Sequence, residues 1–197
     1  QQADARSSRR WTGHLSAGLL LADNGRCSEA IPLLEEANRR GNEDLDSTVA
    51  LGRCLLAEGE LVDAESVLLD ARSIAPDRVD TLLTLAKAVG NQLDRRADAL
   101  AAFDDVLRVD PSNREAHLAL ASLEVAGSHP EVGAERLRAL ALTPGGAADE
   151  ALQKGSKEAL AHAAFRAKRY AEAAGHYAEA VKLAGDDVSS ELLRNLA

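Results

Sequence analysis

The sequence contains no methionine and a single tryptophan, and aromatic residues make up only 3% of its 197 residues. Strands are enriched in aromatic residues, so this shortage, in a chain rich in leucine and alanine, favours close-packed helices over a β-sheet. No run reaches the roughly 18 consecutive apolar residues that a membrane-spanning helix needs, so we expect no direct membrane insertion. Because methionine is missing even at position 1, we expect a processed or cloned fragment, and a signal or anchor upstream of Gln1 stays open.

Cysteine is also scarce. Cys27 and Cys54 lack the short spacing of a metal-binding pair, so we expect free, partly buried thiols. A disulfide would require their Cα atoms to lie within about 7 Å of each other. Free thiols favour a reducing compartment and hence a cytoplasmic protein, and the alternative is a periplasmic protein whose signal sequence has been removed.

The charge balance excludes two classes of partner. The chain has 32 acidic and 23 basic side chains, a formal charge of −9. A field of this sign repels nucleic acids and anionic membranes, so we expect neither as a partner. Catalytic motifs are missing as well, since the sequence has no HExxH, no GxSxG and no phosphate-binding glycine loop before a helix. We therefore expect no enzymatic activity, no metal and no cofactor.

What the sequence does have is a period of about 34 residues, which is typical of an array of one supersecondary unit. Three sets of residues recur with this period, and we call each set a column. One column of small residues is Gly18, Gly52, Ala86, Ala121 and Ala161. A second column of small residues is Ala30, Ala64, Ala99, Gly133 and Ala173. A column of bulky residues is Leu34, Leu68, Phe103, Leu137 and Tyr177. Only Gly or Ala fits where two helices approach closely, so we expect the bulky column to fill the gap opposite.

Each repeat is predicted to be two amphipathic helices joined by a turn. The period divides the chain into an N-terminal segment 1–10, repeats at 11–44, 45–78, 79–113, 114–144 and 154–187, an insertion at 145–153, and a final segment 188–197. The insertion opens with Gly145-Gly146, and it is either a flexible joint or an added turn before the fifth repeat. Segment 188–197 restarts the pattern as a capping helix or a truncated sixth repeat.

The columns resemble the tetratricopeptide repeat. In the second repeat, Leu51-Gly52, Ala64, Leu68, Ala71 and Pro76 match that family's pattern almost position for position, and the likeness extends over about 11–187. The resemblance implies an all-α, right-handed α-solenoid of about five helix-turn-helix repeats. It also implies a non-enzymatic scaffold that binds a peptide or helix of a partner protein in a concave groove lined by the first helices.

If the chain follows the family, two stripes of first-helix residues line that groove. The candidate partner-binding residues are Leu15, Leu19, Val49, Arg53, Leu83, Lys87, Leu118, Ser122, His162 and Phe165. Arg53 and Lys87 suit a partner with an acidic group. The alternative is that the leucines are half-buried between adjacent first helices and that the two cations only keep the surface soluble.

Three further hypotheses remain. The chain could be the repeat segment of a larger cell-envelope or secretion assembly, or the regulatory arm of an enzyme whose catalytic domain lies elsewhere. Leucines in the terminal repeats could also pair two copies as a homodimer.

Overall fold

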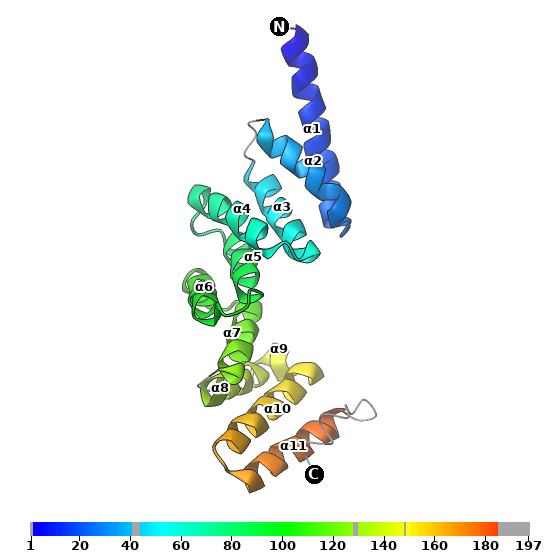
Figure 1. The fold of residues 1–197 in the computed structure, drawn as a ribbon. Coiled ribbons are helices and arrows are strands. Elements are labelled where there is room, and N and C mark those ends of the chain that lie inside the picture. The colour runs from blue at the N-terminus through cyan, green and yellow to red at the C-terminus, as the bar shows by residue number, and fades with distance from the viewer. Residues whose placement is uncertain (1, 41–43, 128–129, 148, 185–197) are drawn as a thin grey trace. The chain divides into compact units, whose positions relative to one another are not determined.

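The computed structural model describes residues 2–40, 44–127, 130–147 and 149–184, and these contain helices and no strand. The chain forms two compact units, residues 1–111 (unit 1) and 112–197 (unit 2). The helices of unit 1 are α1 (Gln2–Asp23), α2 (Cys27–Arg39), α3 (Leu45–Glu58), α4 (Leu61–Ile74), α5 (Val79–Gly90) and α6 (Arg96–Val109). Those of unit 2 are α7 (Arg114–Ala126), α8 (Pro130–Ala141), α9 (Pro144–Ala147), α10 (Glu150–Arg166) and α11 (Tyr170–Ala184). Figure 1 shows the helices in this order.

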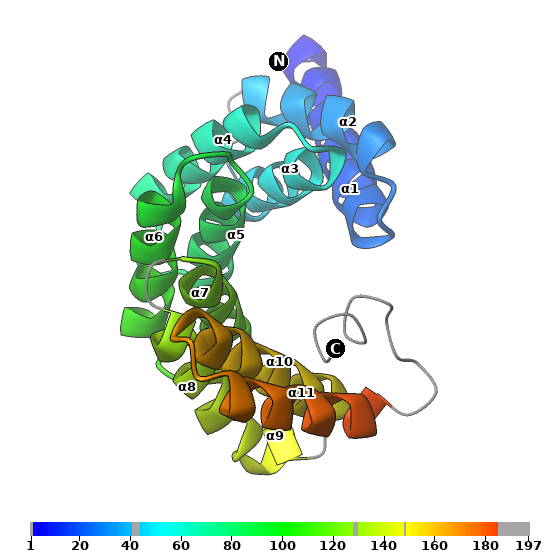
Figure 2. The same ribbon diagram turned by 60° about the horizontal axis from the view of Figure 1, so that its bottom comes forward.

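Within each unit the helices pair as antiparallel hairpins. In unit 1, α2 packs against α1 and α3, α4 packs against α3 and α5, and α6 packs against α5. The first helices α1, α3 and α5 also contact one another in turn, and Figure 2 shows them on one side of the unit. In unit 2, α8 packs against both α7 and α10, and α11 packs against α10. The all-α repeat fold expected from the period is confirmed.

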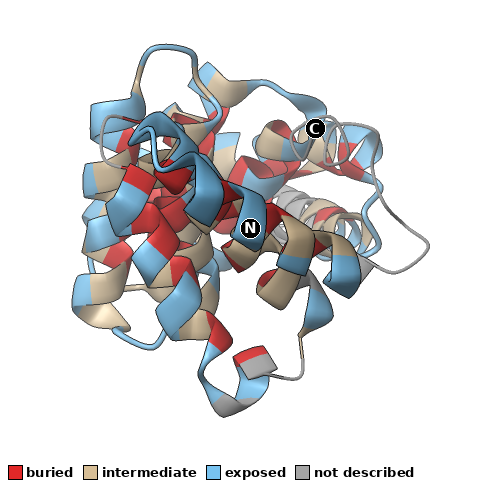
Figure 3. Cartoon of the chain, turned by 90° about the horizontal axis from the view of Figure 1, so that it is seen from below, coloured by how far each residue is buried: buried red, intermediate tan, exposed pale blue. Residues whose placement is uncertain are grey.

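The cores consist of the three periodic columns. Every member of both small columns and of the bulky column is buried. A Cβ atom built on Gly52 would lie 2.5 Å from Cγ of Leu68, and one on Gly18 would lie 2.8 Å from Cδ2 of Leu34. The expectation that bulky residues fill the space left by the small ones is therefore confirmed. Buried residues accordingly gather where helices face each other, as Figure 3 shows.

Side chains that hydrogen-bond free backbone groups fix the starts of several helices. A side-chain oxygen of Asp44 accepts a hydrogen bond from the Ser47 amide at 3.1 Å and begins α3. Asn113 caps α7 in the same way, and Asp149 caps α10. Helix α3 ends at Gly59, whose φ of +84° is a conformation that glycine adopts without strain.

The N-terminal end of the chain differs from the sequence prediction. Residues 2–10, expected as a separate N-terminal segment, belong to α1. No glycine or proline interrupts residues 2–12, so nothing in this stretch prevents the helix from extending. The helix expected at 188–197 lies outside the described residues.

The insertion is an added turn rather than an open joint. It contains α9 and, from Glu150, the first turns of α10. The side-chain amide of Gln153 donates hydrogen bonds to the carbonyl oxygens of Ala141 at 2.6 Å and Gly146 at 3.0 Å. These bonds join the start of α10 to the end of α8 and to α9.

The expectation of free thiols was wrong. Cys27 and Cys54 form a disulfide, and their Cα atoms lie 4.8 Å apart. The two residues are far apart in sequence, but the first turn of α2 lies beside the buried face of α3. The period predicted both helices without predicting which residues of each would meet.

Gly133 provides a test of the close helix approach in unit 2. A Cβ atom there would meet the carbonyl oxygen of Ala121 and lie 2.7 Å from the backbone nitrogen of Val125. Backbone atoms cannot rotate away, so we expect Gly133→Ala to lower the free energy of unfolding by about 2 kcal/mol, measured by urea denaturation. The control is Gly175→Ala, because a Cβ there meets nothing within 4 Å, and it should raise stability by about 0.5–1 kcal/mol. Equal stabilities for the two variants would contradict the packing described here.

Reducing the disulfide should destabilise unit 1. The bond joins residues separated by 27 positions, and a loop of this size corresponds to about 3 kcal/mol of stability. Urea unfolding with and without dithiothreitol should show this difference. A Cys27→Ser/Cys54→Ser variant should match the reduced protein and be insensitive to the reductant. Detection of free thiols in the denatured, unreduced protein would argue against the bond.

Candidate functional site

In unit 1, the first-helix face is mostly packed. Leu15 and Leu19 of α1 and Leu83 of α5 are half-buried, and Val49 of α3 is only 4% exposed. Val49 therefore offers almost no surface to a partner. The leucines keep part of their side chains accessible, but they do not form an open groove by themselves.

The two expected cations of this face lie on different helices. Arg53 of α3 is exposed, and its guanidinium lies 3.1 Å from a carboxylate oxygen of Asp23 at the end of α1. Both side chains are at least half exposed, so this ion pair contributes little to stability. Lys87 lies on α5 and is half-buried. A partner carboxylate could replace Asp23 beside Arg53 at a small energetic cost.

Unit 2 contains an open groove on the side formed by its own first helices. The groove has a volume of about 740 Å³, and its walls are the first helices α7 and α10, with α8 as the floor. Its lining is Leu118, Ser122, Val125 and Ala126 of α7, Leu137 of α8, the capping residue Asp149, and Leu152, Gly155, Glu158, Ala159, His162 and Arg166 of α10. We call this the α7–α10 groove. It brings together Leu118, Ser122 and His162 of the expected site.

Phe165, the remaining expected site residue of unit 2, is not part of the lining. It is 56% exposed and packs edge-on against Tyr170, with ring centroids 5.5 Å apart. The pair lies where α10 turns into α11.

The polar groups around the groove are largely bonded within the chain. Asp149 forms an ion pair with Arg114, and the guanidinium of Arg166 donates to the carbonyl oxygen of Gly127 at 2.6 Å. A ring nitrogen of His162 lies 3.1 Å from the Tyr177 hydroxyl. Glu158 makes no side-chain bond to the described residues. The groove is therefore mainly apolar, and few of its polar side chains lack a bonding partner among the described residues.

The neighbouring helix α11 holds α10 in place. The ammonium of Lys157 on α10 lies 2.6 Å from a carboxylate oxygen of Glu179 on α11. This hydrogen bond holds the pKa of Glu179 below its ordinary value. Tyr177 is buried and packs against His162, so α11 supports α10 at one of the residues that line the groove.

Sequence reasoning found His162 but missed Leu152 and Gly155 in the α10 half of the groove. Leu152 and Gly155 fall in or next to the insertion, where the period no longer assigns positions. The signal that could have found them is Asp149, which is followed at once by a run of good helix formers and so predicts a helix start.

Two kinds of site are missing from the part of the chain that the structure describes. No group of three or more His, Cys, Asp or Glu side chains there could hold a metal ion. No helix in the same residues is long and apolar enough to span a bilayer.

Comparison with known proteins agrees with this architecture. The tetratricopeptide repeat family model matches residues 21–87. No curated protein sequence matches the chain. Three solved structures illustrate the likeness. "MamA MSR-1 C2" is 20% identical, with a TM-score of 0.75 over 91% of this chain and 99% of that one. The tetratricopeptide repeat protein TTC0263 of Thermus thermophilus is 23% identical, with a TM-score of 0.58 over 94% and 96%.

A tetratricopeptide repeat protein from Parabacteroides merdae is 14% identical, with a TM-score of 0.77 over 95% of this chain and 71% of that one. Identities this low establish the fold and not a shared partner. The resemblance first seen in Leu51-Gly52, Ala64 and Leu68 is confirmed. Residues 21–87 match the tetratricopeptide repeat, and the described residues have the all-α repeat fold of tetratricopeptide repeat proteins.

Proposed function

We propose that the chain is a non-enzymatic protein-interaction scaffold that binds a helix of a partner protein in the α7–α10 groove. The observation that carries the proposal is an open, mainly apolar groove of about 740 Å³ between two helices that share a third as their floor. A surface hollow of this kind on a repeat protein is suited to a ligand that brings its own apolar face. The tetratricopeptide fold is consistent with this role.

The dimensions of the groove favour a helix as the ligand. The lining residues of α10 run from Leu152 to Arg166, a length of about 21 Å at 1.5 Å per residue. Helix-in-groove recognition places apolar side chains at i, i+3 or i+4, and i+7 into such a trough. Gly155 and Ala159 leave room for a partner backbone to approach α10, while Leu118 and Val125 supply apolar surface on α7. Ser122 and Glu158 provide polar atoms that can orient the ligand.

The proposal extends to the first-helix face of unit 1. Arg53 and Lys87 would attract an acidic group of the partner, and the half-buried Leu15, Leu19 and Leu83 would contact its apolar side chains. The weak, exposed pairing of Arg53 with Asp23 supports this, because exchanging one carboxylate for another costs little.

The disulfide bears on where such a scaffold would work. Disulfides persist in oxidising compartments and are rare in the cytosol. The Cys27–Cys54 bond therefore favours the periplasmic alternative over the cytoplasmic expectation.

Filling the groove should weaken the binding of helical peptides. A Cβ on Gly155 meets nothing within 4 Å, so Gly155→Trp places an indole in the groove without disturbing the core. Helical peptides selected on the wild-type protein from a displayed library should bind this variant at least about tenfold more weakly in fluorescence anisotropy, a loss of about 1.4 kcal/mol.

The matched control is Gly175→Trp on α11, since a Cβ there also meets open space but the residue does not line the groove. This variant should keep its affinity within about twofold. Equal affinities of both tryptophan variants for every selected peptide would contradict the proposal.

The cations of unit 1 can be tested by charge reversal. Arg53→Glu/Lys87→Glu should reduce the recovery of partner proteins from a lysate of the native host by about tenfold, because attraction becomes repulsion. The control is Arg96→Glu/Arg108→Glu, which reverses two exposed cations on the second helix α6. Unchanged recovery by the first pair of substitutions would remove Arg53 and Lys87 from the site.

A further inference from the structure

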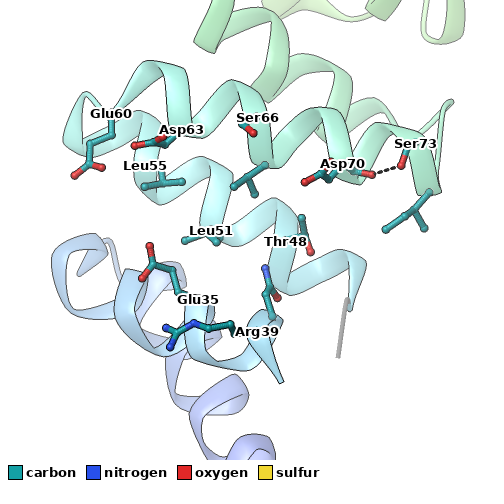
Figure 4. A pocket seen from close by; sticks show the side chains of 13 residues that line it. Glu35, Arg39, Thr48, Leu51, Leu55, Glu60, Asp63, Ser66, Asp70 and Ser73 are labelled. Atoms are coloured by element: carbon teal, nitrogen blue, oxygen red, sulfur yellow. Dashed lines mark hydrogen bonds between the residues drawn. The ribbon is translucent and has the colours of Figure 1, made fainter. Parts of the chain in front are cut away.

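Unit 1 has a hollow of its own, on the side formed by its second helices. It has a volume of about 730 Å³ and lies between α2 and α4, with α3 as its floor. Figure 4 shows Glu35 and Arg39 on the α2 wall, Leu51 and Leu55 on the floor, and the polar residues of the α4 wall. We call this hollow the α2–α4 furrow.

The rim of the furrow is acidic. Glu35 lies on the α2 wall, and Glu60, Asp63 and Asp70 lie on the α4 wall. No side chain of these four residues forms an ion pair or a hydrogen bond with the described residues. Arg39 is the one basic residue of the lining, and its guanidinium is bound to Glu36 at 3.0 Å. The furrow therefore presents four carboxylates that have no ion-pair or hydrogen-bond partner among the described residues, with Arg39 as a cation in the same lining.

Glu65, also on α4, differs from these four acids because its carboxylate is bound within the chain. It does not line the furrow, and one of its carboxylate oxygens lies 2.5 Å from the guanidinium of Arg95 and 2.6 Å from the side-chain amide of Gln92. Burial raises the pKa of Glu65, but these hydrogen bonds outweigh it and the pKa is lowered overall. One face of α4 thus has its carboxylate bound within the chain, whereas the face toward the furrow does not.

The fold gains little from two of the four acids of the furrow, Glu35 and Asp70. Glu60 precedes α4 and Asp63 lies in its first turn, where the helix dipole favours a negative charge. Asp70 lies near the C-terminal end of α4, where the helix dipole disfavours negative charge. The positions of Glu35 and Asp70 are therefore better explained by a cation that arrives from outside the chain than by stability.

The floor of the furrow is apolar. Leu51 and Leu55 close the bottom but are each only 4% exposed, so the apolar surface that a ligand can reach comes mainly from the α4 wall, where Val67 is half-buried. Ile74 at the end of that wall is 51% exposed. The accessible apolar side chains Val67 and Ile74 beside an acidic rim match a ligand with one apolar face and flanking cations.

We propose that the α2–α4 furrow docks a lysine- or arginine-rich amphipathic helix of a partner protein. The lining of the α4 wall extends from Glu60 to Ile74, about 21 Å at 1.5 Å per residue, which accommodates about four helical turns. The surface lies in unit 1, on its second helices, and selects positive charge. It therefore does not depend on the α7–α10 groove, and either proposal can fail alone.

The test uses a leucine–lysine peptide of about 15 residues patterned as an amphipathic helix, with a leucine–glutamate peptide of the same pattern as control. At about 0.15 M salt, the lysine peptide should bind the full chain saturably in isothermal titration calorimetry, and the glutamate peptide should not. Glu35→Gln/Asp70→Asn should weaken the lysine peptide by about fivefold. Both residues are exposed and lie outside the first turn of their helices, so neither change removes a cap or a core contact.

The matched control is Asp77→Asn/Asp104→Asn, which removes two exposed carboxylates of unit 1 that do not line the furrow. It should leave the affinity within about twofold. Equal weakening by both pairs of substitutions would mean attraction by net charge alone and would overturn the proposal. Absence of saturable binding by the lysine peptide would overturn it as well.

Discussion

The structure depends on the close approach of paired helices at glycine and alanine positions. At Gly52, the missing Cβ leaves the space that the buried side chain of Leu68 fills, and Gly18 and Leu34 repeat this arrangement one period earlier. Isolated helices of this length are marginal in water, so packing of this kind supplies most of their stability. The same contact between a small and a bulky residue recurs in the other helix pairs, so one kind of local packing forms the hairpins of both units.

The same constraint explains where the surfaces are open. In unit 1 the first helices contact one another directly, so Val49 is buried and the leucines of this face are half-buried. In unit 2 the turn added at α9 precedes α10, and α7 and α10 meet mainly through α8. The α7–α10 groove lies above this floor. The interruption of the repeat pattern and the groove thus occur in the same part of the chain.

Much of the fold was predictable because periodic columns report helix packing directly. Gly133, Leu137 and Tyr177 were assigned to the core from spacing alone, and all three are buried. The sites were less predictable, because they depend on how neighbouring pairs meet. The sequence showed that Cys27 and Cys54 lie on adjacent helices but not that their Cα atoms lie 4.8 Å apart. It likewise placed Ser122 and His162 on first helices without revealing Gly155 or Leu152 beside them.

The central claim is that the α7–α10 groove holds a partner helix. The most direct measurement is the change in backbone amide chemical shifts when a helical peptide selected on the wild-type protein is titrated into the isotopically labelled chain. The account predicts that the largest shifts fall on groove residues of α7, α8 and α10, with Ser122, Leu137 and Gly155 among them. Shifts that instead centre on α11 or on unit 1, with these residues unchanged, would contradict it.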